Sequence, residues 1–315
     1  MTVAAILLVY AAGAGTFGAR LLGRAGWAVR APLLGIGTYL AAAWSVVAAL
    51  GLAGLTLAVR ATALGGVLSQ LIGACVLRLR DAYATPGGAA VAGLGLTLAA
   101  AVAARTAIAA VTHLRAVRQH AARHAQTARL VGRPDPDLGA TLVDHAQPAA
   151  YCVAGPHPTV IVTTAALQAL DPEQLDAVLA HERAHLAGRH HLLLAIARIG
   201  RQVLPFVPLM RAADTQITRL VEMHADDAAT AGRDAGPLAT ALVVLARGAG
   251  PAPGLAAAAT DAVQRIGRLL RPAEPLSRVR RQLLRAGAAA LILTPVLLAL
   301  TPAIVALALG RVPAA

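Results

Sequence analysis

Five consecutive residues near the middle of the chain, His181-Glu182-Arg183-Ala184-His185, have the types and spacing of a metal-dependent hydrolytic site. On a helix, His181 and His185 stand one turn apart on one face, so both imidazoles can reach a single ion. Zinc suits such a site because it accepts imidazole and carboxylate ligands and lowers the pKa of a bound water to about 7. Glu182 is then expected to take the proton from that water and pass it to the leaving amine.

A second polar segment offers the third metal ligand that the first motif lacks. Thirty-seven residues after the second histidine comes the segment 222–226, which reads Glu-Met-His-Ala-Asp. Glu222 is the expected third ligand, which leaves the fourth zinc position open for water. Asp226 lies one helical turn further on the same face and can hydrogen-bond a ligand from behind. The alternative is an exposed helix with incidental polar residues, but two histidines and two carboxylates that converge favour a metal site.

The helix that carries the first motif has a well-marked beginning. Asp171 is the expected N-cap, Pro172 fits the first helical position, and Gln174 stands at the capping-box position. Gly188 is the expected end. The apolar stretch 192–210 that follows is interrupted by two arginines and two prolines, so we expect it along the membrane surface rather than across the membrane.

A small β-hairpin is expected just before this helix. Residues 150–154 and 159–163 are β-prone and are separated by a Gly-Pro-His-Pro turn. The second strand alternates, with Val160 and Val162 on one face and Thr159, Ile161 and Thr163 on the other. We expect this second strand to be an open edge, onto which an extended substrate peptide adds by main-chain hydrogen bonds.

The composition places these elements beside a membrane. Of the 315 residues 57% are hydrophobic and only 14% are charged, and the mean hydropathy is +0.65, which excludes an ordinary soluble domain and a disordered protein. Aromatic residues are only 3%, which disfavours a large β-sandwich. Four charge-free runs approach or exceed the roughly 20 residues that a membrane-spanning helix needs. They are residues 2–19, 31–59, 82–104 and 286–310.

Three further features concern how the apolar stretches lie in the membrane. The first run could be a signal peptide, but its positive charges follow the apolar stretch, so we expect an uncleaved anchor with its N-terminus outside. Residues 61–77 are uncharged but include Ser69 and Gln70, so they could form a fifth span or a re-entrant hairpin. Arg105, near the end of the third run, is expected to extend toward the membrane interface.

The long polar stretch between the third and last spans holds most of the charge. Residues 113–285 contain 20 of the 28 arginines, 14 of the 15 acidic residues and all 10 histidines. Arginines are dense at both ends, which is the positive-inside pattern and predicts a cytoplasmic domain. Its net charge of +6 lies beside membrane spans, so anionic lipid is a better partner than nucleic acid. The expected organisation is a membrane domain at 1–112, a peptidase domain at 113–285 and a last span at 286–315.

The motifs together resemble the BlaR/MecR-type membrane zinc metallopeptidases, gluzincins related in motif to the HtpX and CAAX prenyl proteases. The resemblance is carried by Tyr151-Cys-Val-Ala-Gly, Val160-Ile-Val-Thr-Thr, the run from Glu173 to His185, and Glu222-Met-His-Ala-Asp-Asp-Ala-Ala. The order of three spans, a polar domain and one span agrees. It implies a mostly α, integral-membrane fold of about four spans with an inserted α+β gluzincin-type domain. It also implies zinc ligands at His181, His185 and Glu222, a catalytic Glu182, and a cytoplasmic winged-helix repressor as substrate.

The chain departs from the antibiotic-sensing members of that group. It ends at Ala315, shortly after the last span, so no large extracellular penicillin-binding domain is expected. Three other functions stay open: an HtpX-like quality-control protease, a catalytically silent membrane adaptor, and a channel or transporter component. The intact Glu182 disfavours the adaptor, and the spans lack the paired charges typical of a transporter.

Several polar residues near the motifs are expected to have surface or packing roles. Three histidines, at 157, 190 and 191, could stabilise an oxyanion, but a surface or packing role is the better interpretation of each. His224 lies on a different face from Glu222 and is not an expected ligand. Cys152 is expected to be a small buried side chain, and Arg183 a surface charge.

Overall fold

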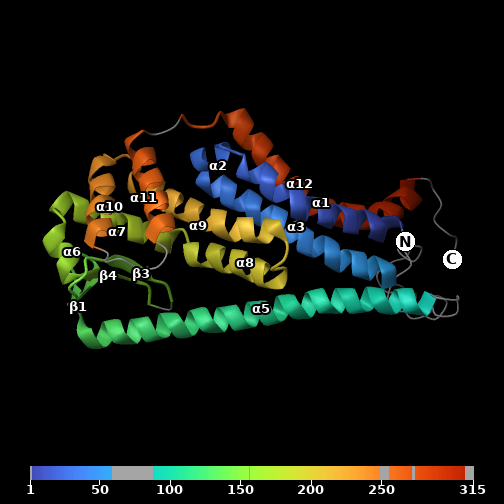
Figure 1. Cartoon of the computed structure of the whole chain (residues 1–315), viewed down its shortest axis with the longest axis horizontal. Coiled ribbons are helices and arrows are strands. Elements are labelled where there is room, and N and C mark those ends of the chain that lie inside the picture. Colours follow the sequence, from blue (N-terminus) through green and yellow to red (C-terminus); the bar gives the residue numbers. More distant parts are fainter. Residues whose placement is uncertain (1, 59–87, 156, 249–254, 272–273, 309–315) are drawn as a thin grey trace.

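The computed structural model describes residues 2–58, 88–155, 157–248, 255–271 and 274–308 (Figure 1). The segment 61–77, for which the sequence allows a fifth span or a hairpin, lies outside the described residues.

Four helices among the described residues are long and apolar enough to cross a membrane. They are α1 (Thr2–Gly23), α3 (Pro32–Ala58), α5 (Gly88–Val131) and α12 (Arg278–Ala308), with the single turn α2 (Trp27–Arg30) between the first two. Small residues let them pack closely: a Cβ on Gly54 would come within 2.6 Å of the carbonyl oxygen of Gly95, so α3 and α5 cross backbone to backbone. The chain is a multi-pass membrane protein.

Helix α5 continues well beyond its apolar part. It runs without a break for 44 residues and leads directly into the first strand of the sheet (Figure 1). At 1.5 Å per residue this is about 66 Å, roughly twice the thickness of a bilayer core. One rigid element therefore connects the spans with the polar domain.

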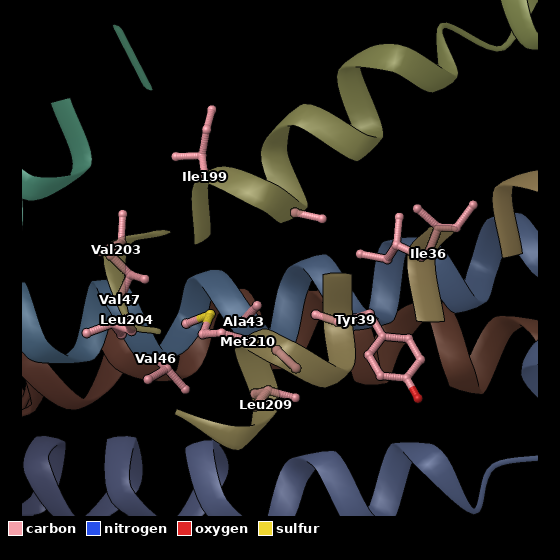
Figure 2. Packing of buried hydrophobic residues seen from close by; sticks show 14 of the residues in the cluster. Ile36, Tyr39, Ala43, Val46, Val47, Ile199, Val203, Leu204, Leu209 and Met210 are labelled. Atoms are coloured by element: carbon pink, nitrogen blue, oxygen red, sulfur yellow. The ribbon is translucent and has the colours of Figure 1, made fainter. Parts of the chain in front are cut away.

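A helical hairpin from the polar stretch packs among the spans. It consists of α8 (His190–Val203) and α9 (Pro208–Ala229), which lie beside α3 and α5 in Figure 1. Figure 2 shows Ile199 and Val203 of α8 and Leu209 of α9 in one core with Ile36 and Val46 of α3. Part of the apolar face of residues 192–210 is thus buried against α3, while Leu192, Ile196 and Phe206 are exposed. That this stretch lies along the membrane surface stays a prediction.

Arg105 explains how the tip of this hairpin is held. Its Nε donates to the carbonyl oxygen of Val203 at 3.0 Å and its Nη2 to that of Gln202 at 2.9 Å. A guanidinium at a helix C-terminus satisfies carbonyl groups that have no partner within the helix and interacts favourably with the helix dipole. Arg105 thus caps α8, where the sequence suggested that it extends toward the membrane interface.

The polar domain contains a four-stranded mixed sheet. Its strands are β1 (Gly132–Asp135), β2 (Ala140–Val143), β3 (Ala150–Val153) and β4 (Thr159–Thr163), in the order β1-β2-β4-β3. The predicted hairpin is present, with β3 antiparallel to β4. On its other side β4 pairs in parallel with β2. The prediction that residues 159–163 form an open edge is therefore wrong, since both sides of β4 are paired and the edge strands of this sheet are β1 and β3.

Helices cover both faces of this sheet. Val160 and Val162 pack with Val178 and Leu179 of α7, while Ile161 on the opposite face packs with Ala121 of α5, so the predicted alternation is confirmed. The remaining helices of the domain are α6 (Thr164–Ala169), α7 (Pro172–Ala187), α10 (Gly236–Gly248) and α11 (Leu255–Leu270). The predicted fold class, mostly helical with a small α+β domain inserted before the last span, is confirmed.

Candidate metal centre

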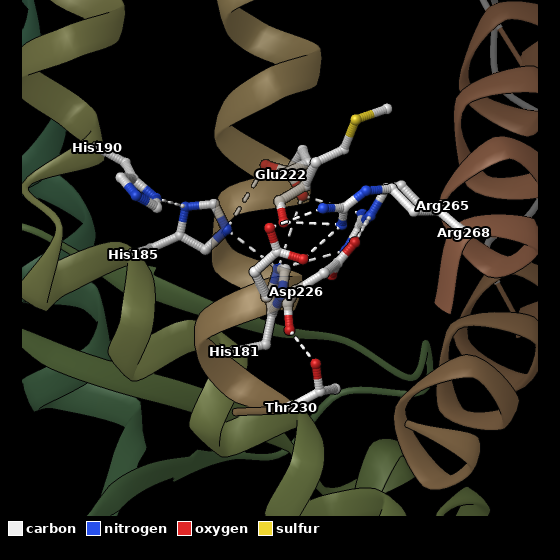
Figure 3. Close-up of polar contacts among 10 residues, drawn as sticks. His181, His185, His190, Glu222, Asp226, Thr230, Arg265 and Arg268 are labelled. Carbon is white, nitrogen blue, oxygen red and sulfur yellow. Dashed lines mark hydrogen bonds and ion pairs between the residues drawn. The ribbon is translucent and has the colours of Figure 1, made fainter. Parts of the chain in front are cut away.

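Two helices bring together the side chains that could hold a metal ion. The beginning of α7 is fixed by the predicted capping box, in which Asp171 Oδ1 accepts from Gln174 N at 2.9 Å and Gln174 Oε1 accepts from Asp171 N at 3.3 Å. Two turns further along α7 stand His181 and His185, and Glu222 reaches them from α9 (Figure 3). One ligand atom from each of the three lies within 4.8 Å of the others.

The distances between these atoms fit a single zinc ion. The two Nε2 atoms of His181 and His185 are 3.0 Å apart, and each lies 3.6 Å from one oxygen of Glu222. Ligands about 2.0–2.1 Å from a tetrahedral zinc are separated by about 3.3 Å, which falls within this range. The donor set of two imidazoles and one carboxylate is one that zinc uses in catalytic sites.

Each histidine is oriented by a group behind it. His181 Nδ1 lies 3.0 Å from Asp226 Oδ1, so its Nε2 faces the other ligands. His185 Nδ1 lies 2.9 Å from Nδ1 of His190, and His190 Nε2 lies 2.9 Å from Nδ1 of His224. Asp226 therefore stands where the sequence predicts it. His190, expected as a surface or packing residue, and His224, not expected as a ligand, form a chain of imidazoles behind His185.

Arg265 of α11 closes the other side of the site (Figure 3). Its guanidinium binds both oxygens of Asp226 at 2.7 and 2.8 Å and lies 2.9 Å from Glu222 Oε2. Sequence reasoning assigned Arg265 to the arginines that flank the last span, and so missed it as part of the site. Arg268 lies three residues after Arg265, and its guanidinium pairs with Asp227 at 2.7 Å. This helical spacing was the one signal in the sequence that both arginines lie on the same side of α11, facing the site.

The charges of the site are set by burial and by these partners. Burial disfavours the charged form of His181, but hydrogen bonds to Asp226 and Glu222 outweigh burial and raise the pKa of its imidazole to about 9. Burial lowers the pKa of His185 to about 4. Burial alone would raise the pKa of Asp226, but the bonds from Arg265 and His181 lower it to about 2. The carboxylate of Asp226 is therefore a fixed negative charge.

Glu182 occupies a different environment from the ligands. Burial raises the pKa of its carboxyl group above the ordinary value, as expected for a group that exchanges protons. Its side chain interacts with the thiol of Cys152 on β3, and burial raises the pKa of that thiol to about 12. Cys152 thus stays protonated and can donate to the carboxylate, so it is more than the small buried side chain that the sequence suggests.

A cavity of about 650 Å³ opens beside the histidines. Its walls come from α5, β3, α7 and α8, and include Tyr151 and Cys152 of the edge strand together with His185. The strand predicted to bind substrate, residues 159–163, does not line this cavity, whereas residues 151–153 of β3 and the following Ala154 do. Arg183 is exposed, as expected, and donates to the carbonyl oxygen of Leu138 at 2.6 Å.

Comparison with known proteins identifies the class of this centre. Residues 113–213, which include α7 and both histidines, match Peptidase family M48. The M48 peptidases are zinc-dependent endopeptidases that act on proteins, and this part of the chain is similar to them. Together with the possible metal site at His181, His185 and Glu222, the similarity makes this membrane protein a zinc metallopeptidase. The match ends nine residues before Glu222, so the third member of the ligand group lies outside the matched residues. No curated protein and no solved structure matches the chain.

Proposed function

We propose that the chain hydrolyses peptide bonds of a cytoplasmic protein, with His181, His185 and Glu222 as zinc ligands and Glu182 as the catalytic base. The observation that carries this proposal is the convergence of the three ligand atoms within 4.8 Å, with the Glu182 carboxyl group next to the first ligand in the sequence. The proposed domains are a membrane domain at 1–112, a peptidase domain at 113–285 and a last span at 286–315.

The roles of the side chains follow from their positions. When bound, zinc supplies Lewis acidity to a water molecule and to the substrate carbonyl group. Glu182 takes a proton from the attacking water and transfers it to the amine nitrogen as the C–N bond breaks. Its raised pKa suits both halves of that transfer. Asp226 holds His181 by its Nδ1, so that Nε2 is left for the metal.

The edge strand β3 is the proposed seat for substrate. Its residues Tyr151, Cys152 and Val153 pair with β4 on one side only, and they line the cavity that reaches His185. An extended peptide added to this edge would run past Glu182, which interacts with Cys152. This geometry favours a locally unfolded stretch of protein over a small molecule.

We place the peptidase domain on the cytoplasmic side. Exposed arginines cluster at both junctions with the spans, which are the end of the apolar part of α5 and the beginning of α12. These residues are Arg115, Arg118, Arg123, Arg278, Arg280, Arg281 and Arg285. The positive-inside rule supports this orientation, in which the N-terminus lies outside. A reporter inserted near Gly250 that is active only outside the cytoplasm would reverse it.

For the substrate we propose a small DNA-binding repressor of the winged-helix type, so that cleavage acts in signal transduction. This finer assignment rests on the resemblance to BlaR/MecR-type peptidases. Quality control in the manner of HtpX is the competing function, and the two functions differ in how many proteins are cleaved. A signalling peptidase cuts few proteins at defined bonds, whereas a quality-control protease degrades many unfolded membrane proteins.

Glu182→Gln tests the catalytic assignment. The variant keeps all proposed ligands, so it should retain one zinc per chain while casein hydrolysis falls by about 10²- to 10⁴-fold. Loss of zinc from the variant would show that Glu182 has another role, and a wild type that binds zinc without hydrolysing any protein would favour a silent adaptor. Comparing the proteomes of cells that carry wild type or the variant then distinguishes the signalling function from quality control. Broad accumulation of misfolded membrane proteins, with no repressor stabilised, would exclude the signalling function.

A further inference from the structure

The turn between α7 and α8 has an unusual backbone that serves one side chain. Arg189 adopts φ +48°, the left-handed region, and is the only described non-glycine residue that does so. Such a conformation costs about 1 kcal/mol or more and persists where the surrounding structure requires it. Directly after it, His190 is 1% exposed, although it is the first residue of a helix. The turn therefore folds an imidazole back into the interior.

The preceding glycine makes room for that imidazole. A Cβ on Gly188 would lie 2.4 Å from His190 Nε2 and 2.7 Å from its Cδ2, closer than real atoms approach. Gly188 itself has φ −75°, which any residue can adopt, so its lack of a side chain matters only for space. Gly188 and Arg189 thus both act on the placement of one ring.

The hydrogen bonds of His190 give that placement a direction. If His185 Nε2 faces the ion, its proton is on Nδ1 and is donated to His190 Nδ1 across 2.9 Å. The proton of His190 is then on Nε2 and is donated to His224 Nδ1 across 2.9 Å. Each ring in this chain has a single tautomer that satisfies its neighbours. Asp226 performs the same task for His181 from the other side of the site.

We propose that His190 is a positioning residue for the metal centre, which accepts a hydrogen bond from His185 and thereby fixes the ring so that its Nε2 is presented to zinc. His224 holds His190 in turn. The inference rests on the proposed function in that His185 is taken as a ligand. It assigns a specific role to His190, for which the sequence predicts only a surface or packing role.

Two substitutions at position 190 separate positioning from packing. His190→Leu fills the same buried space without an acceptor, whereas His190→Asn keeps an acceptor in a smaller side chain. The full-length protein in detergent is titrated with zinc against a chromophoric chelator, which reads metal affinity independently of activity. We expect His190→Leu to weaken zinc binding by about 10- to 100-fold, the usual effect of losing a group that orients a ligand. His190→Asn should recover most of that loss.

A glycine pair supplies a matched test that changes no polar group. Gly188→Ala should displace the ring of His190 and weaken zinc binding to a similar extent. Gly267→Ala on α11, where a Cβ meets nothing within 4 Å, should leave zinc affinity unchanged. Substituting Co²⁺ gives a second readout, because the visible spectrum reports the ligand geometry and should change in the Gly188 variant but not in the Gly267 variant.

The outcomes distinguish this proposal from the function on which it rests. Wild-type affinity in both His190→Leu and Gly188→Ala, while Glu222→Gln loses zinc, would overturn the role of His190 and leave the metal centre intact. If His190→Leu and His190→Asn lost zinc affinity equally, the imidazole ring would be needed only for packing. That result would also overturn the role of His190. A wild type that binds no zinc would overturn both proposals together.

Discussion

The two halves of α9 lie in opposite environments. The first half carries Leu209, Met210 and Ile217, all almost fully buried among the spans and α8. Figure 2 shows the first two of them in this core. The second half carries Glu222 and Asp226, which are surrounded by imidazoles and guanidinium groups (Figure 3). One helix therefore joins the membrane core to the metal centre without a loop between them. The position of Glu222, a proposed ligand, therefore depends on two sets of contacts. One is the apolar packing of the first half of α9 among the spans, and the other is the set of polar contacts around Glu222 itself.

Removing the positive charge of Arg265, which pairs with the carboxylates of the second half of α9, should have the largest effect on stability. Arg265, with its side chain 14% exposed, pairs with Glu222 and bidentately with Asp226. Arg265→Gln leaves the buried carboxylate of Asp226, and the partly exposed one of Glu222 beside it, without their cation. Loss of the partner of a buried charge usually costs about 3–5 kcal/mol. We expect a clearly lower thermal midpoint for the metal-free protein in detergent.

Arg219→Gln is the matched control for this change. Arg219 also joins α9 to α11, through an ion pair with Asp261 at 2.8 Å, but it touches no proposed ligand. Its loss should lower the midpoint by much less, because the side chain of Asp261 is 44% exposed and ion pairs open to solvent contribute about 1 kcal/mol or less. Equal effects of the two substitutions would contradict the special position of Arg265.

Truncation in the apolar half should act on folding and leave the chemistry in place. Leu209 is fully buried and packs against Gly18 of α1. Leu209→Ala should destabilise the protein by about 2–5 kcal/mol, the usual cost of such a cavity. The fraction that remains folded should still bind one zinc per chain, measured by metal analysis after size-exclusion chromatography. A folded variant without zinc would show that the two halves of α9 cannot be separated in this way.

The smallest effect concerns pH. Burial raises the pKa of Glu182, so its carboxyl group holds a proton up to a higher pH than an ordinary glutamate does. Because the base must be deprotonated to act, kcat/KM should fall on acidification from a pH above the ordinary value of about 4.3, by about tenfold per unit below the raised pKa. A pH–rate profile of the zinc-loaded enzyme measures this. An acid limb at or below the ordinary glutamate value would contradict it.

Local signals in the sequence predicted the parts of the site that local structure creates. Asp171 and Gln174 cap α7 as expected, and one turn of helix brings His181 and His185 together. The order of the sheet was not predictable in this way, because β1 begins with Gly132, Arg133 and Pro134, residues typical of a chain break. Without β1 and β2 the interior position of β4 could not be foreseen.

The groups missed by the sequence depend on contacts between distant segments. Arg265 looks like one more arginine before a span, and only the folding of α11 onto α9 brings it to Asp226. His190 follows a residue with positive φ, and nothing in the identity of Arg189 announces that conformation. The α8–α9 hairpin reads as interrupted because Arg198 and Arg201 break its apolar run, yet both face Asp214, at 4.0 and 2.7 Å.

The unbroken length of α5 makes it a lever. It crosses α3 closely at Gly95, and its residue Ala121 forms part of the cavity wall 26 residues further along. That separation is about 39 Å along the helix axis, so a tilt of about 5° at that crossing moves the wall by about 3 Å. This is close to the rise of about 3.3 Å for one residue of an extended peptide. If the spans tilted by a few degrees with α5 rigid, the cavity wall at Ala121 would therefore shift by about 3 Å.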